Sequence, residues 1–482
     1  MKKGIFLISF ILCIFFLNTK GQNDIDAFRF SQTDWSGTAR FIGAGGAFGA
    51  VGAEFSALAT NPASIGVFKK SEVTFTPLVV TIMNSSSSYN KNLSKYLSNN
   101  YHLSNAGVVL AFSTKETSNW KGVQFGFGYN RIADFNNELR IEGTSANSSI
   151  MDEFVNAANQ SSRDLSESGP FDTYLAWNTW LLDYDSTQGT YYSPLEKQSL
   201  KQSKYIHTSG SIDEMNFSLG GNYGDKLYLG GTIGVPFINY IEKSTYEEVD
   251  ETDSIGGFEN FEMEDYLYTR GTGINFKIGL LYQPVDFMRF GFAFHTPTFF
   301  NSLKDTYRRD LIANYSDRTY SDESPEQYYR YKLTTPLRIM GNLAFFIKKR
   351  AFISAEYEFA NYGMSSLFAN DYSFSDENQD IRNKYGAQHS VRVGGEVALN
   401  ENFLIRLGYN YKSSPYKENI NDGSSHTASG GIGFRSKSFF LDLAYALKLS
   451  KEKYWLYNPI YVNAAETEYA YHKIALTAGF KF

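Results

Sequence analysis

The last ten residues, Lys473-Ile-Ala-Leu-Thr-Ala-Gly-Phe-Lys-Phe482, decide the fold because their side chains alternate in character. Apolar side chains occupy the even positions and end in a C-terminal phenylalanine, whereas Lys473, Thr477, Gly479 and Lys481 fall on the odd positions. A period of two predicts a strand with one apolar and one polar face. A terminal phenylalanine on such a strand is typical of bacterial outer-membrane barrels, whose last strand closes the sheet.

The start of the chain indicates export. Lys2 and Lys3 precede an apolar run over 5–17, which predicts a signal peptide over 1–21 that is too short to anchor the protein. We find no later run of about eighteen apolar residues, so a helical membrane protein is excluded and a closed sheet remains. We therefore expect a multi-pass protein of the Gram-negative cell outer membrane.

Composition and charge agree with this class. Aromatic residues make up 17% of the chain and glycines number 40, which suits short two-faced strands. The formal net charge is −6 and basic residues are scattered, which argues against nucleic acid as a partner.

The connectors between alternating segments are short and long in turn. Short polar connectors such as 223–226 and 348–350 alternate with long ones such as 84–105, 301–329 and 136–210. A barrel inserted in one orientation shows this pattern, with long extracellular loops. The count predicts an all-β fold, a 14-stranded antiparallel transmembrane β-barrel over 73–482. Because the number is even, we expect both chain ends on the periplasmic side.

The polar face of each strand should line the lumen. In the strand at 403–412, for example, large apolar residues alternate with Arg406, Gly408 and Lys412. The same parity rule assigns six titratable side chains to the lumen: Lys277, Arg289, His295, Arg392, Glu396 and Arg406.

Residues 22–72, between the signal and the first strand, are rich in glycine and alanine. Such residues permit tight backbone packing in a confined space, so we expect an N-terminal periplasmic hatch that plugs the lumen. A short helix is predicted over 47–60, ended by Asn61 and Pro62. The alternative is a soluble N-terminal extension. The candidate hatch residues are Phe41, Gly45, Gly46, Asn61, Pro62 and Ala63.

The order of several motifs along the chain resembles that in FadL-type transporters, and the motif sequences are similar to those of members from Bacteroidetes. These motifs are Thr38-Ala39-Arg40-Phe41, Asn61-Pro62-Ala63, Arg289-Phe290-Gly291 with His295-Thr296-Pro297, and Arg406-Leu407-Gly408-Tyr409. The resemblance implies a barrel occluded by a hatch that takes up long-chain fatty acids or other hydrophobic small molecules passively. In that family's scheme the loops capture the ligand, a barrel pocket receives it, and it leaves sideways at a kinked strand beside the hatch.

One long loop, 136–210, carries apolar residues at helix-like spacing that suit capture. They are Phe171, Tyr174, Leu175, Trp177, Trp180 and Leu181. Exposed apolar clusters usually mark binding sites. Packing against a second helix around 151–158 explains the same pattern, and both explanations stay open.

Catalysis, metals and cofactors are not expected. His102-Leu103-Ser104 and His207-Thr208-Ser209 are spaced like a hydrolase dyad, but no orienting group is identifiable in the sequence. His295 has no second ligand at suitable spacing, so no metal site is predicted.

Two alternatives to uptake remain. The chain could be an accessory barrel of a Bacteroidetes protein-secretion system that binds cargo or a larger channel through its loops, or it could take up haem. As partners we expect membrane lipids, a hydrophobic ligand and the barrel assembly machinery acting on Phe482, with the protein itself a monomer.

Overall fold

The computed structural model describes residues 23–34, 36–115, 117–160, 165, 171–348, 350–418 and 420–482. The predicted signal peptide over 1–21 lies outside the described residues.

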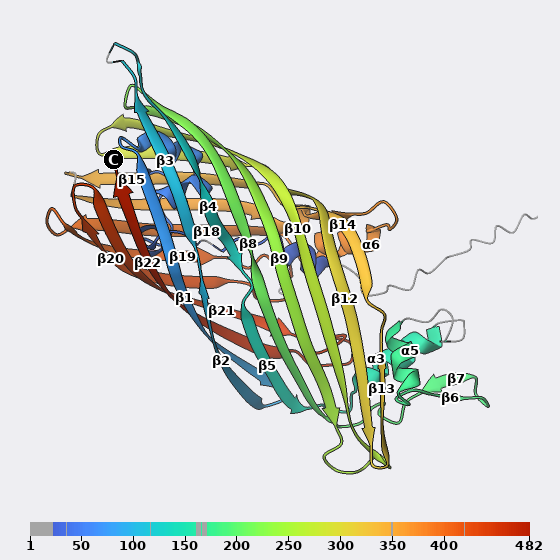
Figure 1. Ribbon diagram of the computed structural model, residues 1–482. Coiled ribbons are helices and arrows are strands. Elements are labelled where there is room, and N and C mark those ends of the chain that lie inside the picture. The colour runs from blue at the N-terminus through green and yellow to red at the C-terminus, as the bar shows by residue number, and fades with distance from the viewer. Residues whose placement is uncertain are drawn as a thin grey trace, which may run out of the picture.

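One antiparallel sheet of twenty strand segments forms the body of the molecule, and the pairing of the first segment with the last closes it into a barrel (Figure 1). The segments are β1 (Glu72–Tyr89), β2 (Asn92–His102), β3 (Asn105–Ser113), β4 (Trp120–Asp134), β5 (Asn137–Thr144), β8 (Lys201–Tyr223), β9 (Leu227–Val249), β10 (Phe258–Val285), β11 (Met288–His295), β12 (Phe299–Tyr315), β13 (Arg318–Glu323), β14 (Gln327–Thr334), β15 (Arg338–Ile347), β16 (Ala351–Asn361), β17 (Ser366–Phe368), β18 (Ala387–Ala398), β19 (Phe403–Lys412), β20 (Ser425–Arg435), β21 (Phe439–Tyr454) and β22 (Ala465–Lys481).

Several segments continue one another across a short break. β3 continues β2, β5 continues β4, β12 continues β11, β14 and β15 continue β13, and β17 continues β16. The barrel therefore has 14 strands, which confirms the predicted number and the antiparallel closure.

The connections differ between the two ends of the barrel. At the short-connection end they span only a few residues, as at 224–226 and 399–402; at the long-connection end they include 145–200 and 369–386. The alternation agrees with the prediction, but the loop predicted over 136–210 spans only 145–200, because β5 and β8 take its two ends. Two further predicted loops are wrong. Residues 84–105 and 301–329 are mostly strand, because these hairpins extend the sheet with few apolar side chains and so lack the two-faced pattern.

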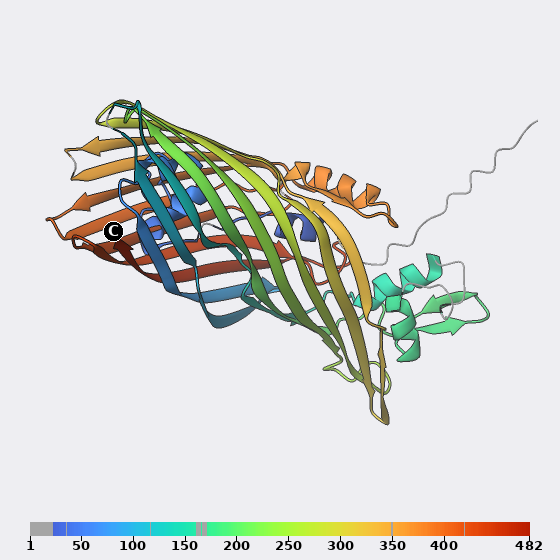
Figure 2. The same ribbon diagram turned by 45° about the horizontal axis from the view of Figure 1, so that its top comes forward.

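Helices of the barrel are confined to the long-connection end. They are α3 (Ile150–Gln160), α5 (Phe171–Asn178), α6 (Ser375–Lys384) and the short 3-10 helix η3 (Tyr362–Met364). α3 and α5, with the small hairpin of β6 (Asp183–Asp185) and β7 (Thr190–Tyr192), form a lobe beyond the strands (Figure 2). No helix in the described part of the chain is long and apolar enough to cross a membrane.

The two faces of the sheet differ sharply. Leu407 on the outward face is 71% exposed, whereas its inward neighbour Arg406 and the inward Arg392 on the adjacent strand are 1% and 0% exposed. An apolar outer face suits hydrocarbon, and charged inner side chains need partners inside the barrel. The wall therefore presents its polar groups to whatever fills the interior.

The residues before β1, Asn23 to Ser71, are named here the N-terminal segment. They include α1 (Asp24–Arg29), α2 (Ala39–Gly43) and the 3-10 helices η1 (Phe55–Ala59) and η2 (Pro62–Val67). The single helix predicted over 47–60 is wrong, because Gly52 and Ala53 have φ of +71° and +50° and break it. The Asn61 side chain accepts a hydrogen bond from the Ala63 N–H, so Asn61 begins η2 instead of ending a helix.

The N-terminal segment runs from one end of the barrel to the other. Phe28 in α1 stacks on Tyr385, which follows α6 at the long-connection end, with ring centroids 4.5 Å apart. Ser71 accepts a hydrogen bond from the backbone of Phe482 at the opposite end. The prediction that both chain ends lie on one side is therefore wrong for Asn23 and Phe482, because the segment crosses the barrel before β1 begins.

Candidate functional site: the N-terminal segment against the barrel wall

Glycines in the wall let the backbone of the N-terminal segment approach closely on two sides. On one side, a Cβ added at Gly408 would lie 2.1 Å from the Gly45 nitrogen. On another, a Cβ added at Gly230 would lie 2.3 Å from the Pro62 oxygen. No side chain fits at such distances, so glycine is required at both positions for the segment to lie where it does.

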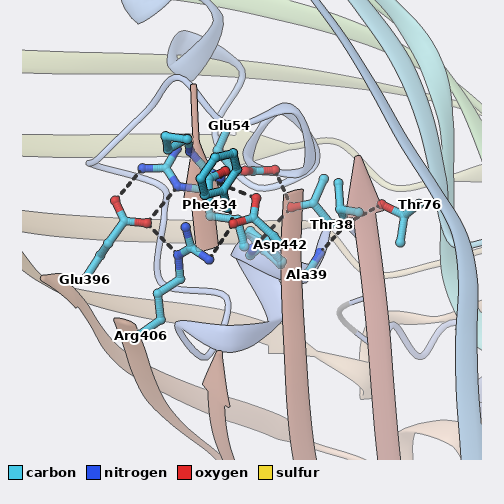
Figure 3. Close-up of polar contacts among 12 residues, drawn as sticks. Thr38, Ala39, Glu54, Thr76, Glu396, Arg406, Phe434 and Asp442 are labelled. Carbon is cyan, nitrogen blue, oxygen red and sulfur yellow. Dashed lines mark hydrogen bonds and ion pairs between the residues drawn. The ribbon is translucent and has the colours of Figure 1, made fainter. Parts of the chain in front are cut away.

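A chain of buried ion pairs joins α2 to β18, β19 and β21. Arg40 donates two hydrogen bonds to Glu396, at 2.9 and 3.0 Å. Glu396 also accepts from Arg406 at 2.5 Å, and Arg406 in turn donates to Asp442 at 2.7 Å (Figure 3). Arg435 pairs with the same Asp442 carboxylate. Buried charges are tolerated when each is paired in this way, so Arg40 of the segment completes a network of the wall.

Hydroxyl groups extend this contact to the first and last strands. The Thr38 hydroxyl, at the start of α2, donates to Glu54 at 2.7 Å, and the Ala39 N–H donates to Thr477 at 2.7 Å (Figure 3). Thr477 on β22 lies 2.7 Å from Thr76 on β1. The start of α2 is therefore bound next to the line where the barrel closes.

A second network joins the stretch between α2 and η1 to β15, β16 and β18. Arg392 pairs with Glu356 at 2.5 Å and with Glu358 at 2.8 Å. The Gly49 N–H donates to Glu356 at 2.9 Å. Arg338 donates one hydrogen bond to Glu358 and another to the Ser31 carbonyl, each at 2.7 Å. Segment and wall again satisfy each other's polar groups.

Carbonyl groups of the segment bind two more of the predicted lumen residues. Arg289 donates to the carbonyls of Ala50 and Val51, at 3.3 and 2.5 Å. His295 Nε2 lies 2.9 Å from the Thr60 carbonyl. Lys277 does not reach the segment in any hydrogen bond found among the described residues; it pairs with Glu214 on β8.

The structure thus brings five of the six predicted lumen residues into contact with the N-terminal segment, directly or through one carboxylate. The candidate hatch residues lie in the same place. Phe41 packs on Phe48, Gly45 and Gly46 follow α2, and Asn61 donates to Asn342 at 3.2 Å. Pro62 and Ala63 begin η2 against the strands β8 to β10.

Sequence reasoning missed a cluster of three lysines around Asp34. Lys473 lies 2.9 Å from the Asp34 carboxylate, Lys448 3.6 Å and Lys412 4.0 Å. Burial raises the pKa of Asp34, but the ammonium groups of these lysines outweigh it and hold the pKa well below its usual range. Lys412 and Lys448 follow inward parity in their strands, which was the available signal, but Asp34 carries no pattern that marks it as their partner.

The wall has a seam beside the N-terminal segment. β2 pairs only with β1 and β5 only with β8 among the described residues, so no ladder joins β2 to β5. Side chains of β1 reach β5 from the inner face: the Ser85 and Ser87 hydroxyls donate to backbone carbonyls of β5. On the side of the seam toward the short-connection end, β3 and β4 are joined by a regular antiparallel ladder.

The N-terminal segment is hydrogen-bonded to the wall where the seam ends toward the short-connection end of the barrel. The Ser36 hydroxyl lies 2.6 Å from the Ser104 hydroxyl, in the break between β2 and β3, and Ser104 also donates to the Gly37 carbonyl. The Asp34 N–H donates to the Ile132 carbonyl of β4 at 2.8 Å. The segment therefore binds the point where the two neighbouring strands separate.

The candidate capture residues divide into two groups. Leu175 and Leu181 are buried in a cluster that includes Met151 and Phe154 of α3, so they pack between helices. Trp180 is 60% exposed, and Tyr174 and Trp177 are more than a third exposed. Phe171 packs at the edge of the cluster, with its ring 6.0 Å from that of Tyr307. Packing and exposure are both present in this lobe.

The two His-x-Ser pairs do not assemble as dyads in the contacts described. His102 Nδ1 lies 3.3 Å from Asp134, and His207 Nδ1 lies 3.3 Å from Glu138. Each histidine thus has an acid neighbour that the sequence did not reveal. The Ser104 hydroxyl, however, is engaged with Ser36 and Gly37 instead of His102.

The closed sheet of 14 strands with an apolar outer face defines a multi-pass transmembrane β-barrel of the outer-membrane type. A FadL homologue from Pseudomonas aeruginosa has a similar structure, with a TM-score of 0.56 at 13% identity over 93% of this chain and 99% of that chain. The P. putida toluene transporter TodX gives a TM-score of 0.52 at 11% identity, over 93% and 99% of the two chains. No family model and no curated protein sequence matches the chain. The fold is that of FadL-type barrels.

Proposed function

We propose that this protein is a passive outer-membrane channel for hydrophobic small molecules, long-chain fatty acids among them, and that the N-terminal segment closes it. The observation that carries the proposal is the binding of the segment at the seam, through Ser36 and Gly37 to Ser104. Proteins of similar fold include a FadL homologue and a toluene transporter, which supports a hydrophobic ligand.

Closure of the lumen follows from contacts on facing sides of the wall. The segment lies against Gly408 of β19 and also against Gly230 of β9, and it supplies Arg40 to the ionic network of β18. A polypeptide held on both sides in this way blocks passage of polar solutes. We infer that the segment is a plug and that its seam contact is the part that opens.

Capture would take place at the exposed aromatic residues of the α3 and α5 lobe. Trp177 and Trp180 present apolar surface at the long-connection end. Each buried CH₂ group of a ligand contributes about 0.8 kcal/mol, so an alkyl chain can leave water for such a surface without an energy source.

Release would take place sideways through the seam. Among the described residues no backbone ladder joins β2 to β5, whereas neighbouring strands such as β3 and β4 are joined by a full ladder of backbone hydrogen bonds. When Ser36 and Gly37 leave Ser104, a ligand inside the barrel can pass between the two strands into the hydrocarbon of the membrane.

A reversible cross-link tests the release step. The hydroxyls of Ser36 and Ser104 are 2.6 Å apart, so Ser36→Cys with Ser104→Cys can form a disulfide that fixes the segment at the seam. The only cysteine of the sequence is Cys13, inside the predicted signal peptide, so the pair is chemically unambiguous. Uptake of a labelled long-chain fatty acid and of labelled toluene should fall at least tenfold when the cysteine pair is oxidised to the disulfide. Uptake should return when the disulfide is reduced.

A second cysteine pair provides the matched control. The hydroxyls of Ser218 and Thr232 lie 2.7 Å apart on β8 and β9, so Ser218→Cys with Thr232→Cys links wall to wall and leaves the segment free. Uptake in this control should not depend on oxidation. Full uptake by the oxidised Ser36–Ser104 pair would contradict release at the seam.

An interaction role is the second candidate, because the same aromatic lobe can bind a protein partner. Trp180 and Tyr184 of this lobe are 60% and 44% exposed. Co-purification of a secretion partner that is lost in Trp180→Ser with Tyr184→Ser, while uptake stays unchanged, would favour this role.

A further inference from the structure

Three tyrosine–histidine pairs lie on the outward face of the barrel. In each, the tyrosine hydroxyl contacts Nδ1 of a histidine, at 2.7 Å for Tyr357 with His389, 2.7 Å for Tyr409 with His426 and 2.8 Å for Tyr445 with His472. Each pair joins two strands: β16 with β18, β19 with β20, and β21 with β22. Half of the six histidines in the sequence are used in this repeated arrangement.

The strand registers place the three histidines at a common depth in the wall. His472 is in register with Ala428 through Leu447, and His426 lies two residues nearer the long-connection end than Ala428. His426 is in register with Val391 through Tyr411, and His389 again lies two residues nearer that end.

This stepwise shift compensates for the tilt of the strands. Followed from β1 through β22 to β11, the registers lead from Val80 in the middle of β1 to Met288, the residue at the short-connection end of β11. Rows of paired residues therefore descend toward the short-connection end in this direction, as they do in any tilted barrel. The histidines rise by the same amount, so they form a level row around one side of the barrel.

The tyrosine hydroxyl fixes the direction of each imidazole ring. When the hydroxyl donates to Nδ1, the ring proton lies on Nε2, which then points away from the tyrosine as a donor. Tyrosines of an ordinary aromatic girdle direct their hydroxyls to water or headgroups themselves. Here the hydroxyl is used within the protein. His389 and His426 are exposed and turn Nε2 to the surroundings, whereas Nε2 of His472 lies 3.3 Å from the Asn84 amide nitrogen and is already engaged.

Apolar residues lie directly below the row, toward the short-connection end. Val391, Ala428 and Ile474 face outward next on their strands, and Val391 and Ile474 are each 42% exposed. The charged residue nearest above, Glu468 on β22, is already paired with Lys451. The surface thus combines oriented N–H donors with a hydrocarbon-facing strip, which matches an amphipathic molecule with an anionic head.

We propose that the tyrosine–histidine row binds the phosphate group of a phospholipid or glycolipid in the leaflet at the long-connection end. His389 and His426 are two strands apart, about 10 Å. Each phosphate therefore accepts from Nε2 of one of these histidines, and its acyl chains lie on the apolar strip below. The site is separate from the lumen and from the seam, since β16 to β22 are on another part of the wall.

Native mass spectrometry of the full chain in detergent tests the proposal. The probes are dioleoylphosphatidic acid, which carries a phosphate, and dioleoylglycerol, which has the same acyl chains without one. The wild type should bind phosphatidic acid at least about fivefold more tightly, as expected for charge-assisted hydrogen bonds. The variant His389→Leu with His426→Leu and His472→Leu should bind both lipids equally.

Two further variants keep the result interpretable. Tyr357→Phe with Tyr409→Phe and Tyr445→Phe retains the rings but frees the imidazoles, and should lose most of the preference for phosphatidic acid even if the histidine variant fails to fold. Tyr223→Phe with Tyr282→Phe changes two outward tyrosines at the short-connection end. This variant should keep the preference for phosphatidic acid. Equal binding of the two lipids by the wild type, an unchanged preference in the histidine and tyrosine variants, or full displacement by inorganic phosphate at equal concentration would each overturn the proposal.

Discussion

The N-terminal segment is held by two chemically different regions of the wall. Against β18, β19 and β21 its contact is ionic, through Arg40 and the buried pairs around Glu396. Against β3 and β4, η1 makes an apolar contact beside the hydrogen bond of Asp34: the ring of Phe55 lies over Gly107 and Gly128, where an added Cβ would come within 2.2 and 2.4 Å of it.

The difference shows how one segment can be both fixed and removable. An apolar contact tolerates small shifts because dispersion and burial have little directionality, whereas buried ion pairs lose most of their stabilisation when one partner moves. The ionic region should therefore determine the resting position of the segment, and the apolar region should allow it to move and return. Three substitutions test this contrast.

Removing Arg406 should have the largest effect. Its guanidinium is buried between Glu396 and Asp442, so Arg406→Met leaves two carboxylates with one fewer partner each. Loss of a buried partner costs about 3–5 kcal/mol, and we expect about 3 kcal/mol because Arg40 and Arg435 remain. Urea unfolding in phospholipid vesicles measures the loss, and entry of a large polar antibiotic should increase.

An exposed ion pair serves as the control for that substitution. Arg308 pairs with Asp310 at 3.0 Å, but its side chain is 45% exposed. Arg308→Met should change the free energy of unfolding by about 0–1 kcal/mol and leave antibiotic entry unchanged. Equal losses in the two variants would show that the ionic network has no special role.

Shortening Phe55 should have an intermediate effect. Phe55→Leu removes part of a buried ring but keeps an apolar side chain between Gly107 and Gly128, so we expect a loss of about 1–2 kcal/mol. Because the contact is not directional, the segment should stay in place and antibiotic entry should remain low. An increase in entry as large as that of Arg406→Met would contradict the division into ionic and apolar regions.

Asp34→Asn should have the smallest effect, with a defined pH dependence. The lysines hold the pKa of Asp34 well below its usual value, so the carboxylate stabilises the folded state above the unfolded pKa of about 3.9. That contribution is lost as pH falls through the folded pKa. The side chain is 32% exposed, so solvent screens the effect. The urea midpoints of wild type and variant should differ equally at pH 7 and 5, begin to approach each other below about pH 4, and meet only below the folded pKa of Asp34.

The sequence predicts the barrel well because the alternation of apolar and polar residues within each strand shows which side chains face outward and which face inward. Arg392, Glu396 and Arg406 are recognisable as inward residues from their neighbours alone, and the strand number follows from counting such segments. The hairpins at 84–105 and 301–329 were predicted as loops because polar residues such as Ser85 and Ser87 occupy their buried inner face and few apolar residues alternate with them.

The contacts of the site could not be predicted in the same way. Glu396 meets Arg40, which is 356 positions earlier in the chain, and His295 meets a backbone carbonyl of Thr60. Neither pairing leaves a local signal, since it depends on the path of the segment through the barrel and on the close approach that glycines allow. Gly230 and Gly408 were visible as glycines, but their partners were not.

The route of the N-terminal segment also constrains biogenesis. Its first described residues contact α6 at one mouth of the cylinder, whereas Ser71 leads into β1 at the other mouth. Threading α1 and its aromatic side chains through a finished, occupied cylinder would require unpairing of the wall. We therefore expect the sheet to close around the segment, with the pairing of β22 and β1 as the step that encloses it.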